Sequence, residues 1–207
     1  MKHLIKLEDW DRKEHFAFFS EFEEPFYGIN VKIDCTHAYA MAKEKGQSFF
    51  LYYLYRTLKA VNKIENFKYR IIEQEVYLFD RIDVSCTIMR EDGLFAYAHM
   101  DYYEDEEEFI RHSNIEIAKV QQATTLMPSE YAVNEIHFSA IPWIDFSSIS
   151  HARKFSRPDS SPKISFGKVV TADEKKWVSV SIHVHHGFVD GYHLGLFVDK
   201  LQELMNA

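Results

Sequence analysis

Alternating apolar and polar positions predict several β-strands along the chain. Residues 27–35 place Ile29, Val31 and Ile33 on one face, which is the pattern of a half-buried strand. The clearest alternation covers residues 176–186, where valine and isoleucine alternate with tryptophan, serine and histidine. Shorter strands are predicted at 68–73, 75–80, 82–89, 93–99, 136–141 and 162–170. The first four of these form two hairpins, of which the second has an Asp-Gly turn.

Apolar residues at helical spacing predict four helices. Residues 11–22 carry phenylalanines at this spacing, and residues 47–65 have the pattern of a long buried helix. Acidic residues at 101–108 begin a helix that ends near residue 123. We interpret this run as a helix start and not as a metal site, because negative charge stabilises the first turn of a helix. Residues 192–206 carry an apolar stripe of leucine, phenylalanine and valine.

Strands and helices are therefore mixed without a strict βαβ alternation. This order predicts an α/β fold class in which helices cover a mixed β-sheet as a two-layer sandwich. The 207 residues contain only 7 Gly and 5 Pro, and no repeat, low-complexity segment or linker divides them. We expect one domain over residues 1–207, because 46% hydrophobic residues are enough for a core in a chain of this length.

Charge and cysteine content argue against several classes of protein. The chain has 24 basic and 32 acidic residues, a net charge of −8, which disfavours a nucleic-acid-binding surface. Cys35 and Cys86 are too few for a disulfide framework and lack a C-x-x-C spacing, so we expect a reduced, cytoplasmic protein. The longest apolar run, residues 49–55, is far shorter than the roughly 20 residues that cross a bilayer. No membrane span or membrane partner is expected.

The segment 183–193, HVHHGFVDGYH, carries most of the candidate chemistry. A histidine at a strand end can act as a general base, because its pKa of about 6.5 suits proton transfer at neutral pH. Asp190 could orient an imidazole or pair with a cation, and the spacing does not decide between these roles. A structural role is open for each histidine. His183, His185 and Asp190 could also ligate a metal, but the absence of clustered cysteines and of a second H-x-H disfavours this hypothesis.

Three motifs resemble those of the CoA-dependent acyltransferases. Residues 185–191, HHGFVDG, match the signature H-H-x-x-x-D-G, and residues 10–16, WDRKEHF, resemble W-x-R-K/R-E-H-F. Residues 139–146, SAIPWIDF, resemble S-A-x-P-W-x-x-F. Ser139 and His186 are 47 residues apart, as in that family, and a Gly-Tyr-His sequence continues into the last helix. Over nearly its whole length the chain is therefore similar to the trimeric chloramphenicol acetyltransferases.

The resemblance implies a role for each matching residue. His186 corresponds to the histidine that removes a proton from the acceptor hydroxyl, which then attacks the thioester of acetyl-CoA. Ser139 corresponds to the serine that stabilises the oxyanion. Arg12 and Asp190 correspond to a buried pair that shapes the catalytic loop. Ser165 corresponds to a threonine that holds a water near the transition state, and it keeps the hydroxyl.

The resemblance also implies the ligands and the assembly. Acetyl-CoA is expected as cosubstrate, without a metal, and Trp143 corresponds to a tryptophan that lines the CoA channel. Phe18, Phe19, Phe95 and Ser165 are expected to bind the acceptor, and Phe18 and Phe95 keep an aromatic wall there. The expected function is acetylation of a hydroxyl of chloramphenicol, an antibiotic-resistance activity. Members of that family are homotrimers with active sites between neighbouring subunits, and the same assembly is expected here.

Several departures from the family pattern leave the acceptor open. Phe19 replaces a tyrosine that touches chloramphenicol, His137 replaces a polar amide, and Val169 replaces an aromatic residue that packs on adenine. The basic stretch 151–157 could meet CoA phosphates or form a solvated loop. Two alternatives therefore stay open. The same fold and mechanism could acylate a different hydroxyl or amine, or the chain could form a non-catalytic CoA-binding trimer.

Overall fold

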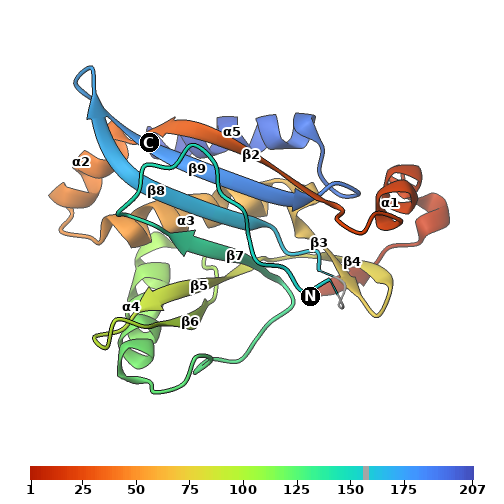
Figure 1. Ribbon diagram of the computed structural model, residues 1–207, viewed down its shortest axis with the longest axis horizontal. Coiled ribbons are helices and arrows are strands. Elements are labelled where there is room, and N and C mark those ends of the chain that lie inside the picture. The colour runs from red at the N-terminus through yellow and green to blue at the C-terminus, as the bar shows by residue number, and fades with distance from the viewer. Residues whose placement is uncertain (156–158) are drawn as a thin grey trace.

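A six-stranded mixed β-sheet is the centre of the computed structural model, which describes residues 1–155 and 159–207 (Figure 1). The strand order is β2-β9-β8-β7-β5-β6. Strand β7 runs parallel to both β5 and β8, and the other neighbouring pairs are antiparallel. The strands are β2 (Phe26–Asp34), β5 (Asp83–Met89), β6 (Phe95–Met100), β7 (Glu135–Ala140), β8 (Lys163–Ala172) and β9 (Lys175–His185).

A smaller three-stranded sheet has the order β1-β4-β3. It consists of β1 (Lys2–Leu4), β3 (Tyr69–Ile72) and β4 (Glu75–Phe79). Strands β3 and β4 form the predicted hairpin, and both of its turn residues, Glu73 and Gln74, have positive φ. This conformation matches the twist of a two-residue hairpin. Strand β1 was not predicted, since its three residues are exposed and carry no alternating burial.

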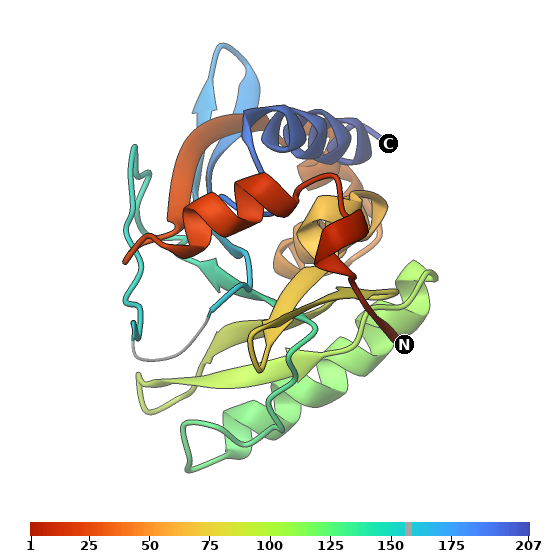
Figure 2. The ribbon, with the colours of Figure 1, turned by 90° about the vertical axis from the view of Figure 1, so that its right-hand side faces the viewer.

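Helices cover one face of the large sheet, and a long connection crosses the other. Figure 2 shows α3, α4 and α5 on one side of the sheet and the segment 141–155, defined here as the covering segment, on the opposite side. The helices are α1 (Lys13–Ser20), α2 (Thr36–Glu44), α3 (Phe49–Lys63), α4 (Glu106–Gln122) and α5 (Gly191–Met205), with short 3-10 turns at Leu7–Asp9 and Glu65–Lys68. In the described part of the chain, no helix has the length and apolar character needed to span a membrane.

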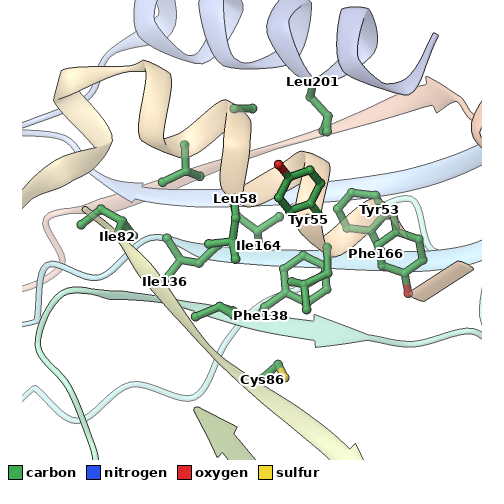
Figure 3. Packing of buried hydrophobic residues seen from close by; sticks show 14 of the residues in the cluster. Tyr53, Tyr55, Leu58, Ile82, Cys86, Ile136, Phe138, Ile164, Phe166 and Leu201 are labelled. Atoms are coloured by element: carbon green, nitrogen blue, oxygen red, sulfur yellow. The ribbon is translucent and has the colours of Figure 1, made fainter. Parts of the chain in front are cut away.

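The strand register gives the sheet one apolar and one polar face. On β9, Val178, Val180, Ile182 and Val184 face the helices and are fully buried. Tyr53 of α3 stacks on Phe166 of β8, with ring centroids 4.6 Å apart, and Figure 3 shows the side chains of α3 among those of the sheet. The opposite face carries two polar rows. One row is Ser139, Ser165, Ser181 and Asn30, and the other is Ser85, His137, Lys163 and His183.

The fold confirms the α/β class and the mixed, helix-covered sheet predicted from the sequence. The acidic start of α4 is also confirmed, because Asp105 caps the helix by accepting the backbone N–H of Glu108 at 2.8 Å. Helix α2 was not predicted. Its only buried residues are Ala38 and Ala42, so the sequence shows no wide apolar stripe there.

Replacing Leu58 by alanine should lower the free energy of unfolding by about 2–5 kcal/mol, because the residue is fully buried on α3 and its removal leaves a cavity. The control is Ile115→Ala on α4, where the side chain is more than half exposed, with an expected loss below about 0.5 kcal/mol. Urea unfolding at one fixed protein concentration measures both values. Equal losses in the two variants would contradict the position of Leu58 in the core.

Candidate active site

His186 directly follows β9 and is held between two aromatic rings. Its imidazole stacks on Phe19 of α1, with ring centroids 3.9 Å apart, and on Tyr27 of β2, with centroids 4.1 Å apart. Its backbone N–H donates to the carbonyl of Pro25 at 2.8 Å. Among the described residues, no hydrogen-bond partner reaches its buried Nδ1. The two stacking contacts therefore hold the ring in place, while its Nδ1 makes no hydrogen bond to another described residue. A general base needs such a fixed position.

An ion pair between Arg12 and Asp190 closes the loop that carries His186. Arg12 is the residue before α1, and its Nη1 lies 2.9 Å from Oδ2 of Asp190, while its Nε donates to the carbonyl of Gly187 at 3.2 Å. Asp190 also caps α5 by accepting the backbone N–H groups of Tyr192 and His193. The carboxylate of Asp190 thus connects the start of α1 to the start of α5. Arg12 is mostly buried, but Asp190 is one-third exposed, so the pair is only partly buried.

The environment favours the charged form of Asp190. Burial alone would raise its pKa, but the hydrogen bond from Arg12 and the charge of His193 lower it, and the net shift is downward. The hydroxyl of Tyr27 is buried beside this pair, and burial and the charge of Asp190 raise the pKa of Tyr27 to about 12. Tyr27 therefore stays protonated at neutral pH. The sequence analysis did not identify Tyr27, because only the pairing of β2 with β9 places it against His186.

His185, the first histidine of the pair, has a structural role. It is almost fully buried, and its Nδ1 accepts the backbone N–H of Gly187 at 3.1 Å. A Cβ on Gly187 would lie 3.0 Å from the His185 ring and 3.1 Å from the Cα of Phe16, so this close approach favours glycine. Burial and the charge of Arg153 lower the pKa of His185 to about 4, which keeps its ring neutral.

Ser139 and Ser165 face a cavity at the polar side of the sheet. The two serines are register partners on β7 and β8, and the cavity, of about 670 Å³, is also lined by Phe95, Trp143 and His151. The Oγ of Ser165 is buried and lacks a hydrogen-bond partner among the described residues. Two-thirds of the surface of Trp143 is exposed. The cavity therefore offers hydroxyl groups and an exposed indole to a ligand.

Within one chain, His186 and Ser139 are far apart. Ser139 pairs with Ser165, Ser165 pairs with Ser181, and His186 lies five residues beyond Ser181. At about 3.3 Å per residue along a strand and about 4.8 Å between strands, Ser139 and His186 are roughly 15–20 Å apart. They cannot contact the same substrate atom within a single chain.

The predicted site residues thus fall into two groups. The first, defined here as the histidine group, contains Arg12, Phe18, Phe19, His186 and Asp190, which lie on or beside α1 and the loop before α5. The second, defined here as the serine group, contains Phe95, Ser139, Trp143 and Ser165 around the cavity. Phe18 is exposed on α1 and contacts Phe19 edge-to-face, with ring centroids 5.1 Å apart.

The hypothetical metal site at His183, His185 and Asp190 is not supported. In the described part of the chain, the group whose ligand atoms come close enough for a metal is Asp83, His99 and Asp101. Arg81 already bridges its two carboxylates, at 3.0 Å from Asp83 and 2.8 Å from Asp101. That cluster is therefore already part of an ion-pair network, which His99 extends to Glu135 at 2.8 Å.

The described part of the basic stretch 151–157, residues 151–155, is irregular, and its side chains alternate between packed and exposed, with Lys154 and Phe155 exposed. The ring of His151 packs edge-on against His183, with centroids 4.8 Å apart, and Arg153 is mostly buried and ion-pairs with Glu24 and Asp159. Ser156 and Arg157 lie outside the described residues. The first part of this stretch is thus folded against the polar face of the sheet.

A fixed histidine and cavity-facing serines are the elements of an acyltransferase site. Residues 2–202 match the family model described as "Chloramphenicol acetyltransferase". A relative of that name from Proteus mirabilis is 26% identical over 201 residues, 97% of this chain and 93% of the relative. Another from Staphylococcus intermedius is 28% identical over 206 residues, 98% of this chain and 95% of the relative. A solved structure described as chloramphenicol acetyltransferase, 32% identical, covers 99% of this chain and 100% of its own with a TM-score of 0.91. The chain belongs to the chloramphenicol acetyltransferase family.

Two substitutions at Asp190 should separate its roles. Asp190→Asn removes the charge that pairs with Arg12 but keeps an oxygen that can cap α5, whereas Asp190→Ala removes both. We expect Asp190→Ala to be less stable than Asp190→Asn by about 1 kcal/mol, the usual contribution of an N-cap. Urea unfolding of the two variants measures this difference. Equal stability would contradict the capping role of Asp190.

Acid should destabilise the protein before its carboxylates titrate. The pKa of His185 is about 4 in the folded chain and about 6.5 when unfolded. Between these values the unfolded state binds more protons, so the free energy of unfolding falls as the pH falls from about 6.5 to about 4. His137 and His151, each with a pKa of about 4, act in the same direction.

The matched variant is His185→Asn, which keeps an acceptor for the N–H of Gly187 but does not titrate. Urea unfolding at pH 7 and pH 5 should show a smaller loss of stability in this variant than in the wild type. An equal loss in both proteins would rule out His185 as a contributor.

Proposed function

We propose that the protein transfers the acetyl group of acetyl-CoA to a hydroxyl of chloramphenicol, with His186 as general base. The observation that carries this proposal is the imidazole of His186, clamped between Phe19 and Tyr27 in a loop closed by the Arg12–Asp190 pair. Membership of the family supports the reaction, and the relatives from Proteus mirabilis and Staphylococcus intermedius bear the name of that activity.

In the proposed reaction, His186 accepts the proton of the acceptor hydroxyl while the hydroxyl oxygen attacks the thioester carbon. The resulting tetrahedral intermediate carries an oxyanion, which accepts a hydrogen bond from the hydroxyl of Ser139. Collapse of the intermediate breaks the carbon–sulfur bond, and His186 returns the proton to the sulfur of CoA. Ser165, whose buried Oγ has no partner among the described residues, holds a water beside this centre.

The proposed enzyme is a homotrimer in which two chains share each site. The distance of roughly 15–20 Å between His186 and Ser139 in one chain supports this assembly, because only a neighbouring copy can bring a serine group to a histidine group. Trp143, exposed at the cavity, then lines the approach of CoA. We further infer one catalytic domain over residues 1–207, a cytoplasmic location where acetyl-CoA is available, and a role in antibiotic resistance.

A second candidate is the same transfer to a different hydroxylated acceptor. Its support is His151, which adds a polar ring to the cavity wall, and Phe19, which stacks on His186 and offers no hydroxyl. These features affect the acceptor and leave the reacting residues unchanged. Both candidates therefore predict the same loss of activity in variants of His186 and Ser139. They differ only in which acceptor is acetylated.

Turnover measured by thiol release from acetyl-CoA with chloramphenicol should depend on both groups. His186→Ala should lower kcat/KM by about 10²–10⁴-fold, the usual contribution of a general base. Ser139→Ala should lower it by about 10²–10³-fold, the usual contribution of one oxyanion donor. The control is His37→Ala, an exposed histidine on α2, which should retain wild-type turnover. Full activity of His186→Ala would refute its assignment as the base.

A further inference from the structure

A second hollow adjoins the cavity at Ser139 and Ser165, on the face of the sheet that the covering segment crosses. It has a volume of about 380 Å³ and shares Tyr97, Ser139 and His151 with the larger cavity. His137 and Lys163 line it as register partners on β7 and β8. The two spaces therefore form one elongated site, apolar near Phe95 and polar near Lys163. We define the Lys163 end as the basic end.

The basic end carries an excess of positive charge. A third hollow of about 330 Å³ extends it and is lined by Arg153, Lys154, Lys163 and one carboxylate, Asp159. Glu24, outside this lining, also pairs with Arg153, so among the described residues Lys154 is the cation without an ion-pair partner. Behind this hollow, the fully buried guanidinium of Arg70 donates only to backbone carbonyl groups. This local excess contrasts with the net charge of −8 of the whole chain. An anion is therefore attracted to this end of the site.

Donors at the basic end are available to a ligand. The Nζ of Lys163 is held by Asp159 at 2.7 Å and by the carbonyl of Ser161 at 3.3 Å, so one of its three N–H bonds is left. Among the described residues, the buried Nε2 of His151 has no partner. Burial, followed by the charge of Lys163, lowers the pKa of His137 to about 4. Burial, and after it the charges of His183 and Lys163, lowers the pKa of His151 to about 4. Both rings are therefore neutral at pH 7, and each can donate one hydrogen bond.

We propose that this site takes a hydroxylated acceptor that also carries a carboxylate, bound by Lys163 and His151. This inference rests on the proposed function, because the acetylated hydroxyl must lie at Ser139. Lys163 is two residues before Ser165 on β8, and His137 is two residues before Ser139 on β7, so the basic end begins about 7 Å from the serine row. The preferred acceptor therefore separates its hydroxyl and its carboxylate by about this distance.

Three benzyl alcohols with different para substituents test this inference by calorimetric binding without acetyl-CoA. They are 4-(hydroxymethyl)benzoate, the neutral 4-(hydroxymethyl)benzamide and the cationic 4-(hydroxymethyl)phenyltrimethylammonium. The benzoate, which spans about 7 Å from hydroxyl to carboxylate, should bind about tenfold more tightly than the benzamide, and the cation should bind most weakly. Equal or weaker binding of the benzoate would overturn the proposal.

Two variants with opposite effects locate the binding. Lys163→Met should reduce the preference for benzoate over benzamide to less than about threefold, since it removes the cation. Asp159→Asn should increase the preference, because it removes the carboxylate that competes for Lys163. The control is Lys200→Met, which makes the same charge change on α5, where Lys200 pairs with Glu203. A preference unaffected by both Lys163→Met and Asp159→Asn would place the carboxylate elsewhere and refute the proposal.

The binding assay also separates this inference from the proposed function. Preferential binding of the benzoate, with no thiol release from acetyl-CoA with either the benzoate or chloramphenicol, would support the anionic subsite and contradict acetyl transfer. Thiol release with chloramphenicol but no preference for benzoate would support acetyl transfer and contradict the anionic subsite. Thiol release with the benzoate, lost in His186→Ala, would support both.

Discussion

The spacing of β-strands is the constraint on which the whole site depends. Hydrogen bonding fixes the distance between neighbouring strands, and the extended backbone fixes the distance along each strand. Because Ser139 lies two strands away from β9 and His186 lies beyond the end of β9, one chain cannot bring them together. The proposed site, which uses both residues, would therefore need a second copy of the chain. The hydrophobic core on the other face keeps the sheet in place.

Contacts within one chain position the side chains of the histidine group and of the serine group. Phe19 and Tyr27 restrict the imidazole of His186 to one plane, and the Arg12–Asp190 pair connects the start of α1 to the start of α5. An imidazole restricted in this way would lose little freedom on substrate binding if it acts as the proposed base. Ser139 and Ser165 are positioned differently, since they are register partners on two paired strands of the sheet. His151 of the covering segment lines both the apolar end and the basic end of the elongated site.

The sequence predicted the large elements because their physical signals are local. Alternation in 176–186 and the apolar stripe of 192–206 follow from one buried face each, and both elements are present as β9 and α5. Strand β1 and helix α2 bury too little apolar surface to leave such a signal. Among the site residues, the motifs identified His186 and Ser139, and local sequence alone would have left each as an ordinary histidine or serine.

Residues whose role depends on cross-strand register were beyond prediction from sequence. Tyr27 meets His186 only because β2 pairs with β9, and Lys163 lies between His137 and His183 only because three strands align there. His137 was noted as a departure, but its combination with Lys163 and His151 in one hollow follows from the fold. Differences in substrate class within a family arise at such positions, where neighbouring strands and a crossing segment combine their side chains.

The shared site can be tested most directly by complementation between two inactive variants. Chains with His186→Ala and chains with Ser139→Ala are refolded separately and as an equal mixture, and thiol release is compared. If each site combines His186 of one copy with Ser139 of its neighbour, every mixed trimer contains one intact site, and the mixture should recover about a quarter of wild-type turnover. Mixed oligomers that form but show no more activity than the separate variants would contradict a site shared between chains.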